Sequence, residues 1–103
     1  MKVNLEQVIH NFSGVPYQTE EGDEATIRFF LNHSFDVVNT TDSKLSINEQ
    51  LKLYSVAKRL ATKRKEITVT ADEAKLLIHR MTQFSIPIVG TLARVFKINH
   101  EQI

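Results

Sequence analysis

The most informative absence in this 103-residue chain is cysteine, which does not occur at all. Without cysteine the chain can form no disulfide, no thiolate nucleophile and no cysteine-based zinc site. Glycine is also scarce, and Gly14, Gly22 and Gly90 stand too far apart for a glycine-rich loop that binds phosphate. Disulfide scaffolds, cysteine-dependent enzymes and phosphate-loop proteins are therefore excluded as classes.

Long apolar runs are missing as well. No run approaches the roughly 18 residues that a membrane-spanning helix needs. The first residues, MKVNLEQVIHNF, lack the apolar core of a signal peptide, because Asn4, Glu6, Gln7, His10 and Asn11 interrupt them. We therefore expect a cytoplasmic protein with no membrane partner.

The arrangement of histidine, serine and acidic residues predicts no enzyme. His10, His33, His79 and His100 never approach the i, i+4 spacing of a zinc-binding helix. No Gly-x-Ser-x-Gly motif occurs. His33 and Asp36 could share a helix face, but such a pair is more often a surface hydrogen bond than half of a catalytic site. We expect no catalytic, cofactor-binding or metal-binding residue and no cofactor.

The composition is that of a folded protein, with 42% hydrophobic and 24% charged residues. A chain of this length can bury one modest core, so residues 1–103 are expected to form a single domain.

Two capping boxes organise the second half of the chain. Ser46 to Glu49 and Thr70 to Glu73 both have the Ser/Thr-x-x-Glu spacing that starts a helix. They predict one helix over residues 46–64 and another from residue 71 to about 84. Pro87 suits the first position of a last helix over residues 87–97, with a bend near Ser85.

The first half of the chain is more ambiguous. The turn pair Ser13-Gly14 favours a small hairpin, whereas the apolar spacing within residues 3–12 also fits a short helix. Residues 25–38 show a helical period, and β-branched residues favour a short extended segment near 66–69. The predicted fold class is α+β and mainly helical, with about four helices, a small N-terminal β-hairpin and that extended segment.

Charge is distributed unevenly along the chain. Residues 1–50 contain three basic and eight acidic residues, whereas residues 51–103 contain ten basic and four acidic ones. The stretch KRLATKRK places five basic residues in residues 58–65, and helical spacing puts Lys52, Arg59 and Lys63 on one face. This stripe suits an acidic protein or nucleic acid, and it also fits a solvated face whose cations stabilise a helix C-terminus.

The last stretch, TLARVFKINHEQI, has the look of a helix-turn-helix motif. If residues 91–97 form the first helix of the motif, only about one turn of the second, base-contacting helix follows in this sequence. One turn is too short to lie in a major groove. If residues 71–84 lead, the first turn of the reading helix offers no Arg, Asn or Gln to base edges. The basic residues of this second helix are Arg94 and Lys97, and they suit contacts with phosphates.

Protein binding is the other functional class. The helix over residues 46–64 has an apolar arc wider than one neighbour needs, formed by Ile47, Leu51, Tyr54, Ala57, Leu60 and Ala61. A partner protein or a second copy in a homodimer could cover it. A further apolar cluster surrounds Pro87, with Met81, Phe84, Ile86 and Ile88. The residues expected to contact a partner are Lys52, Arg59, Lys63 and Arg64 for an acidic one, and Arg94 and Lys97 for either a protein or a nucleic acid. The acidic loop at residues 20–24 suits a basic partner.

The order of elements from NEQLKLYSVAKRL through ITVTADEAKLLIHRMTQFSIPIVGTLARVF resembles small accessory proteins of tailed bacteriophages and prophages. The resemblance covers residues 46–97 and includes the step Pro87-Ile88-Val89-Gly90. It implies an accessory protein that acts in the host cytoplasm by binding a host or viral protein. Together with the residue patterns, it predicts a small protein–protein interaction module, and the alternative is a weakly specific nucleic-acid-binding protein that uses the basic face of the 46–64 helix.

Overall fold

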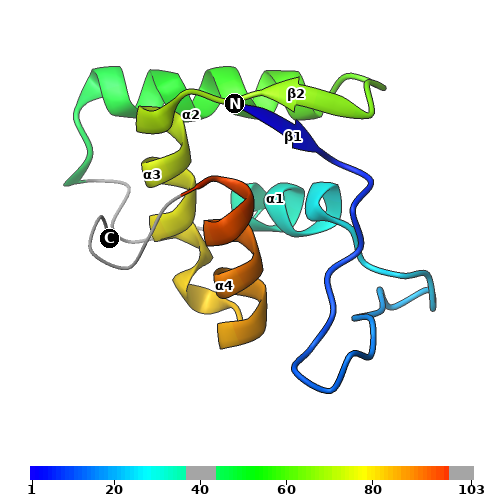
Figure 1. The fold of residues 1–103 in the computed structure, drawn as a ribbon. Coiled ribbons are helices and arrows are strands. Elements are labelled where there is room, and N and C mark those ends of the chain that lie inside the picture. Colours follow the sequence, from blue (N-terminus) through cyan, green and yellow to red (C-terminus); the bar gives the residue numbers. More distant parts are fainter. Residues whose placement is uncertain (37–43, 98–103) are drawn as a thin grey trace.

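The computed structural model of the chain describes residues 1–36 and 44–97, apart from the side chain of Thr82. Its elements are β1 (Lys2–Asn4), α1 (Ile27–Asp36), α2 (Ile47–Leu60), β2 (Glu66–Thr68), α3 (Ala71–Arg80), the 3-10 turn η2 (Met81–Gln83) and α4 (Ile86–Val95). Helix α2 lies across one side of the molecule, with the other helices below it (Figure 1). The expected α+β, mainly helical fold class is confirmed.

The two named strands, β1 and β2, bring together two segments that α1 and α2 separate in the sequence. β1 pairs antiparallel with β2, and Val3 lies opposite Ile67. The N-terminal ammonium extends this contact by donating to the carbonyl of Val69 at 2.8 Å. The extended segment expected near 66–69 is therefore confirmed, and its partner is the strand at the start of the chain.

Between β1 and α1 the chain folds back on itself through two turns with glycine at positive φ. The first turn contains Gly14 (φ +81°), and His10 is bridged to Pro16 across it. The second contains Gly22 (φ +90°), where the N–H of Thr19 donates to Asp23 at 2.8 Å. The small hairpin expected around Ser13-Gly14 is present as this bridged turn, and the alternative of a helix over residues 3–12 is wrong.

Both predicted capping boxes start helices. The Ser46 hydroxyl accepts from the N–H of Glu49 and begins α2, and the Thr70 hydroxyl accepts from the N–H of Glu73 and begins α3. The predicted bend near Ser85 is also confirmed, because Ser85 is the N-cap of α4 and Pro87 lies in its first turn.

The end of α2 differs from the prediction. The helix ends at Leu60, with Ala61 as its C-cap, instead of near Arg64. The guanidinium of Arg28 in α1 donates to the carbonyl of Leu60 at 2.7 Å and to that of Thr62 at 3.0 Å. These carbonyls are satisfied from outside the helix, so the chain leaves the helical path four residues early.

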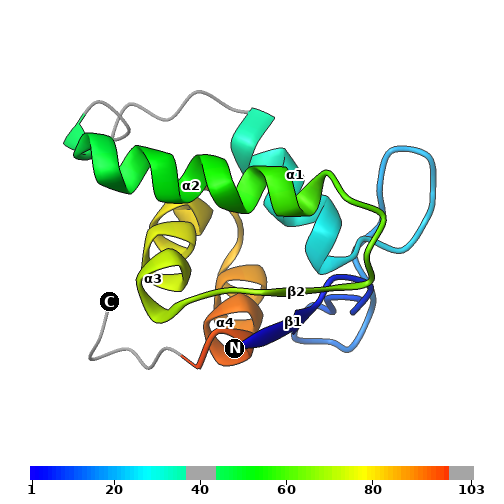
Figure 2. The ribbon, with the colours of Figure 1, turned by 90° about the horizontal axis from the view of Figure 1, so that it is seen from above.

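All the elements contribute to one hydrophobic core. Helix α2 packs against α1 and α3, and the perpendicular view shows it crossing over α1 with α3 beside it (Figure 2). Residues 1–9, α1, α3 and α4 close the other sides. The largest fully buried side chains of this core include Leu5, Ile9, Ile27, Leu31, Leu60, Leu77, Leu92 and Phe96.

Candidate functional site

Helix α2 has a buried apolar face and an exposed apolar face. Leu53 and Val56 are buried in the core, whereas Ile47, Leu51 and Tyr54 are 72%, 58% and 62% exposed. The predicted apolar arc included these three exposed residues but neither Leu53 nor Val56, so the face that meets the core is centred roughly 100° around the helix from the centre of that arc. We call Ile47, Leu51 and Tyr54 the α2 ridge.

The α2 ridge follows directly from the spacing of its residues. Positions i, i+4 and i+7 lie within about 60° of one another around an α-helix. The next position in this series is Lys58, whose ammonium lies 5.6 Å from the centre of the Tyr54 ring. This cation–π contact holds the lysine stem along the end of the ridge.

A groove of about 370 Å³ runs beside the α2 ridge. Tyr54 belongs to both features, because it lines the groove as well as standing on the ridge. The other lining residues are Phe35, Leu45, Gln50, Leu53, Ala57 and Arg80. The guanidinium carbon of Arg80 lies 5.3 Å from the centre of the Phe35 ring, and the guanidinium donates to the carbonyl of Ser34 at 2.7 Å. The charge of Arg80 therefore already makes contacts within the chain. The groove is therefore mainly an apolar surface.

On the other side of α2, the side chain of Arg59 stabilises the fold by contacts with other elements of the chain. Its guanidinium donates to both carboxylate oxygens of Glu73, at 2.9 and 2.5 Å, and to the carbonyl of Thr68 at 2.7 Å. Glu73 is only 5% exposed. The hydrogen bond from Arg59 lowers the pKa of Glu73, and the same bond raises the pKa of Arg59. Arg59 thus links α2 to β2 and α3, a role that its place in the basic stripe did not indicate.

The predicted basic stripe does not form on one helix. Lys63 lies beyond the end of α2, in the loop before β2, because the helix stops at Leu60. Lys52 is on the expected side but forms an exposed ion pair with Asp72 at 3.5 Å. Two of the three predicted stripe residues therefore have acidic partners within the chain.

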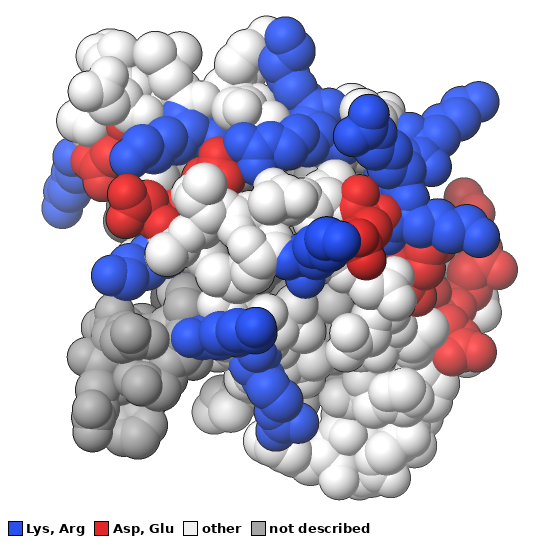
Figure 3. Space-filling view, turned by 45° about the horizontal axis from the view of Figure 1, so that its top comes forward, with Lys and Arg blue, Asp and Glu red and all other residues white. Residues whose placement is uncertain are grey.

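A different group of cations is exposed at the C-terminal end of α2. We call Lys58, Lys63, Arg64 and Lys65 the basic corner; all four are exposed. Lysine and arginine side chains gather along α2 and around this end of it (Figure 3). The other two predicted contact residues, Arg94 and Lys97, are exposed at the end of α4.

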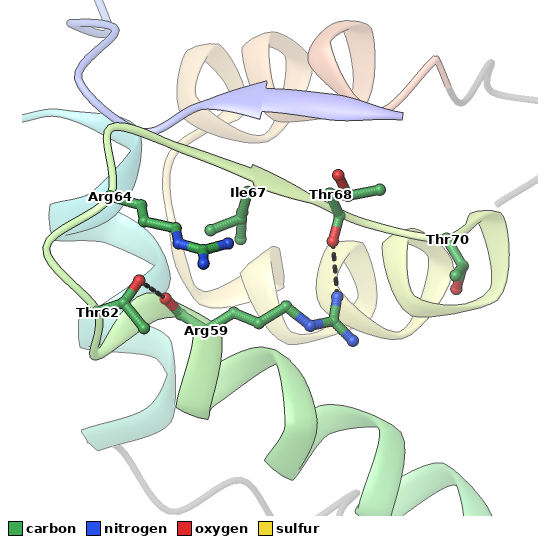
Figure 4. A pocket seen from close by; sticks show the side chains of 6 residues that line it. All are labelled: Arg59, Thr62, Arg64, Ile67, Thr68 and Thr70. Atoms are coloured by element: carbon green, nitrogen blue, oxygen red, sulfur yellow. Dashed lines mark hydrogen bonds between the residues drawn. The ribbon is translucent and has the colours of Figure 1, made fainter.

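A hollow of about 340 Å³ lies between the basic corner and β2, lined by Arg59, Thr62, Arg64, Ile67, Thr68 and Thr70 (Figure 4). Most of its polar groups already serve the fold: Thr62 donates to the Arg59 carbonyl at 2.7 Å, and Thr70 caps α3. The guanidinium of Arg64 points across the hollow (Figure 4). The hollow can offer a positive contact to an anion.

The apolar cluster expected around Pro87 is divided by the fold. Met81 and Ile88 are buried, whereas Ile86 is 77% exposed. Phe12, at the Gly14 turn, is 84% exposed and lines a hollow of about 330 Å³ together with Ile86 and Pro87. This second exposed apolar spot is formed by two short segments instead of one continuous face.

The acidic loop is exposed around the Gly22 turn. Glu20, Glu21 and Asp23 line a hollow of about 470 Å³ that also includes Phe29 and His33, whose rings stack at 6.1 Å. Within residues 1–36 and 44–97, no three His, Cys, Asp or Glu side chains are grouped so that they could hold a metal ion. Among the helices of the same residues, none combines the length and apolar character needed to cross a bilayer.

The geometry thus offers one continuous apolar face on α2, with a basic corner at its end. Residues 98–103, the tail of the helix-turn-helix pattern, lie outside the described residues. Comparison with known proteins adds no relative, because no family model, no curated protein and no solved structure matches the chain.

Proposed function

We propose that this chain is a small protein-binding module whose contact surface is the α2 ridge. The observation that carries the proposal is the 72%, 58% and 62% exposure of Ile47, Leu51 and Tyr54, side by side on a helix that already buries its opposite face. Burying a fully exposed side chain of this size releases roughly 1.5–3 kcal/mol, and covering the exposed part of each of these three releases a share of that free energy. Clusters of this kind on otherwise polar surfaces mark interaction sites.

The surroundings of the α2 ridge supply the other parts of an interface. Tyr54 is the type of residue that dominates binding energy, because it combines a large apolar ring with a polar hydroxyl. The groove beside it accepts an apolar group, and the basic corner supplies a charged rim. In this proposal the protein is not an enzyme and needs no cofactor. The phage or prophage origin and the cytoplasmic location stay predictions from the sequence.

Retention assays on immobilised protein test the proposal. Wild type, Leu51→Glu and Phe12→Glu are immobilised and exposed both to extract of the source cells and to free wild-type chain. We expect Leu51→Glu to retain at least about tenfold less protein, because a buried charge opposes association. Phe12→Glu alters an apolar residue away from α2 that is more exposed than Leu51, at 84% against 58%, and it should behave as wild type. Equal retention by wild type and Leu51→Glu would contradict the proposal.

The basic corner supports nucleic-acid binding as the second candidate function. Its four cations fall within eight residues and could contact about three phosphates, which gives weak, salt-sensitive binding. The test is a mobility shift with duplex DNA at low salt, using Lys63→Glu/Arg64→Glu, which leaves the Arg59–Glu73 pair intact, and Lys75→Glu as the control. A shift lost only in the double variant favours nucleic acid, and no shift with wild type eliminates this candidate.

A further inference from the structure

We infer that Arg28 is a positioning residue, which holds the loop of residues 61–65 as a preformed contact surface for the phosphates of nucleic acid. This inference rests on the second candidate function and names a residue that shapes its site. Arg28 comes from α1, which packs against α2, and it is not a member of the basic corner. The loop of residues 61–65 follows α2 directly and contains three of the four basic-corner cations.

The guanidinium of Arg28 collects three carbonyls from this part of the chain. It donates to the carbonyl of Leu60 at 2.7 Å, to that of Thr62 at 3.0 Å and to that of Arg64. Its Nε lies 3.5 Å from the carboxylate of Glu6. Each of its three nitrogen atoms thus has a partner within the chain, and the side chain is only 23% exposed. Arg28 therefore shapes the loop and does not itself face a ligand.

The far end of the loop is fixed as well. The N–H of Leu5 donates to the carbonyl of Lys65 at 2.8 Å, and the carbonyl of Leu5 accepts from the N–H of Arg28 at 3.0 Å. Leu5 is fully buried in the core. The loop is thus tied at both ends to the same part of the fold. Its backbone has little freedom left to lose when a ligand binds, and such preorganisation favours binding.

Arg28 also improves the electrostatics of the basic corner. The carbonyls at the C-terminal end of a helix carry about half of a negative charge, which opposes an approaching anion. Arg28 places a positive charge against such an end carbonyl, that of Leu60, and against two loop carbonyls. Within the part of the chain that the structure describes, Lys63, Arg64 and Lys65 form no ion pair. Their charges are therefore available to a ligand.

A fixed array of cations gains most from a ligand whose charges are fixed too. Duplex DNA carries about one negative charge per 1.7 Å of its axis, at regular spacing. An acidic protein segment must itself be ordered on binding, which reduces the gain from a rigid loop. The guanidinium of Arg64, which points across the hollow beside β2, has the planar fork that binds a phosphate through two hydrogen bonds (Figure 4). The loop therefore fits the phosphate backbone of nucleic acid better than an acidic protein.

Loss of the Arg28 contacts should weaken binding without removing a phosphate contact. Arg28→Met keeps much of the apolar stem and removes the donors to the three carbonyls. If one released loop residue must be ordered again on binding, the affinity falls by roughly tenfold. The logarithm of the binding constant should fall with the logarithm of the salt concentration with a slope of about −2.7 for three phosphate contacts. Arg28→Met should keep this slope, whereas Arg64→Gln should reduce its size by about 0.9.

Titrations of a fluorescent DNA duplex over a series of salt concentrations test the inference. The variants are Arg28→Met, Arg64→Gln and, as the control for stability, Ile88→Val, which removes one methyl group from a buried side chain of α4. Circular dichroism checks that each variant is folded. Arg28→Lys keeps the charge and is the second variant if Arg28→Met does not fold. It should lie between wild type and Arg28→Met in affinity, with the slope of wild type.

The outcomes separate the inference from the function on which it rests. A variant at Arg28 that binds as wild type, that has the reduced slope of Arg64→Gln, or that weakens no more than Ile88→Val overturns the positioning role and leaves the second candidate function standing. If wild type does not bind the duplex, both fail. If wild type binds polyglutamate more tightly than the duplex at the same salt concentration, the partner is an acidic protein and the nucleic-acid assignment is overturned.

Discussion

The ion pair between Arg59 and Glu73 gives the sharpest prediction about stability. The change to make is Arg59→Met, which keeps much of the apolar stem of the side chain and removes its charge. The carboxylate of Glu73, only 5% exposed, would then lose both guanidinium hydrogen bonds. The Thr68 carbonyl would lose its donor from Arg59 as well.

The expected cost follows from burial. Breaking a fully buried ion pair by removing one partner costs about 3–5 kcal/mol. The Arg59 side chain is 34% exposed, so solvent screens part of this interaction, and the N–H of Thr70 still donates to Glu73 at 2.9 Å. We therefore expect a loss of about 2 kcal/mol in the free energy of unfolding, which lowers Tm by about 10 °C in a domain of this size.

Urea unfolding followed by circular dichroism measures this loss, and a double-mutant cycle with Glu73→Gln isolates the pair. Glutamine keeps the capping box, so Glu73→Gln alone should cost less than Arg59→Met. The cycle should give a coupling energy of at least about 1 kcal/mol. If Arg59→Met unfolds within about 0.5 kcal/mol of wild type, or the two costs simply add, the structural role of Arg59 is wrong and its guanidinium is free for a partner.

Two further predictions concern pH and packing. Because Arg59 holds the folded pKa of Glu73 below its ordinary 4.5, the stabilisation from this group is present above pH 4.5 and is lost as the pH falls through the folded pKa. The stability advantage of wild type over Glu73→Gln in urea unfolding should therefore shrink below about pH 4.5, and a constant difference from pH 7 to pH 3 would contradict the assignment. Leu92→Ala, at a fully buried site, should cost about 2–5 kcal/mol, whereas Ile86→Ala, at a side chain 77% exposed, should stay within about 0.5 kcal/mol in thermal unfolding. Equal costs at the two positions would refute the described packing of α4.

Local signals in the sequence predicted most of the elements. The capping boxes at Ser46 and Thr70 place their hydrogen bonds within four residues, so the pattern alone locates the start of each helix. Pro87 likewise restricts its own backbone and marks the last helix. These features depend on neighbours along the chain and are visible without the fold.

Features that depend on distant contacts were missed. The end of α2 at Leu60 depends on Arg28, which is 32 residues away, and β1 pairs with a strand more than 60 residues further on. Neither contact can be inferred from the residues that are its neighbours in the sequence.

The orientation of α2 could not be inferred from the sequence, for a related reason. Apolar residues occupy more than half of its circumference, so periodicity could not show which part faces the core. The width of the arc was the one local sign of an exposed apolar face, and it pointed to the correct helix. The role of Arg59 could not be separated from that of the other cations until Glu73 was placed beside it.

The most direct test of the central claim is photocrosslinking in extract of the source cells, with a photoreactive phenylalanine analogue in place of Leu51 and, as the matched control, in place of Phe12. Both side chains are exposed, so neither replacement disturbs the core, and only Leu51 belongs to the α2 ridge. If the α2 ridge is the contact surface, the Leu51 replacement should form a discrete crosslinked product and the Phe12 replacement should not. No crosslinked product from the Leu51 replacement, or the same product from both replacements, would contradict the proposed function.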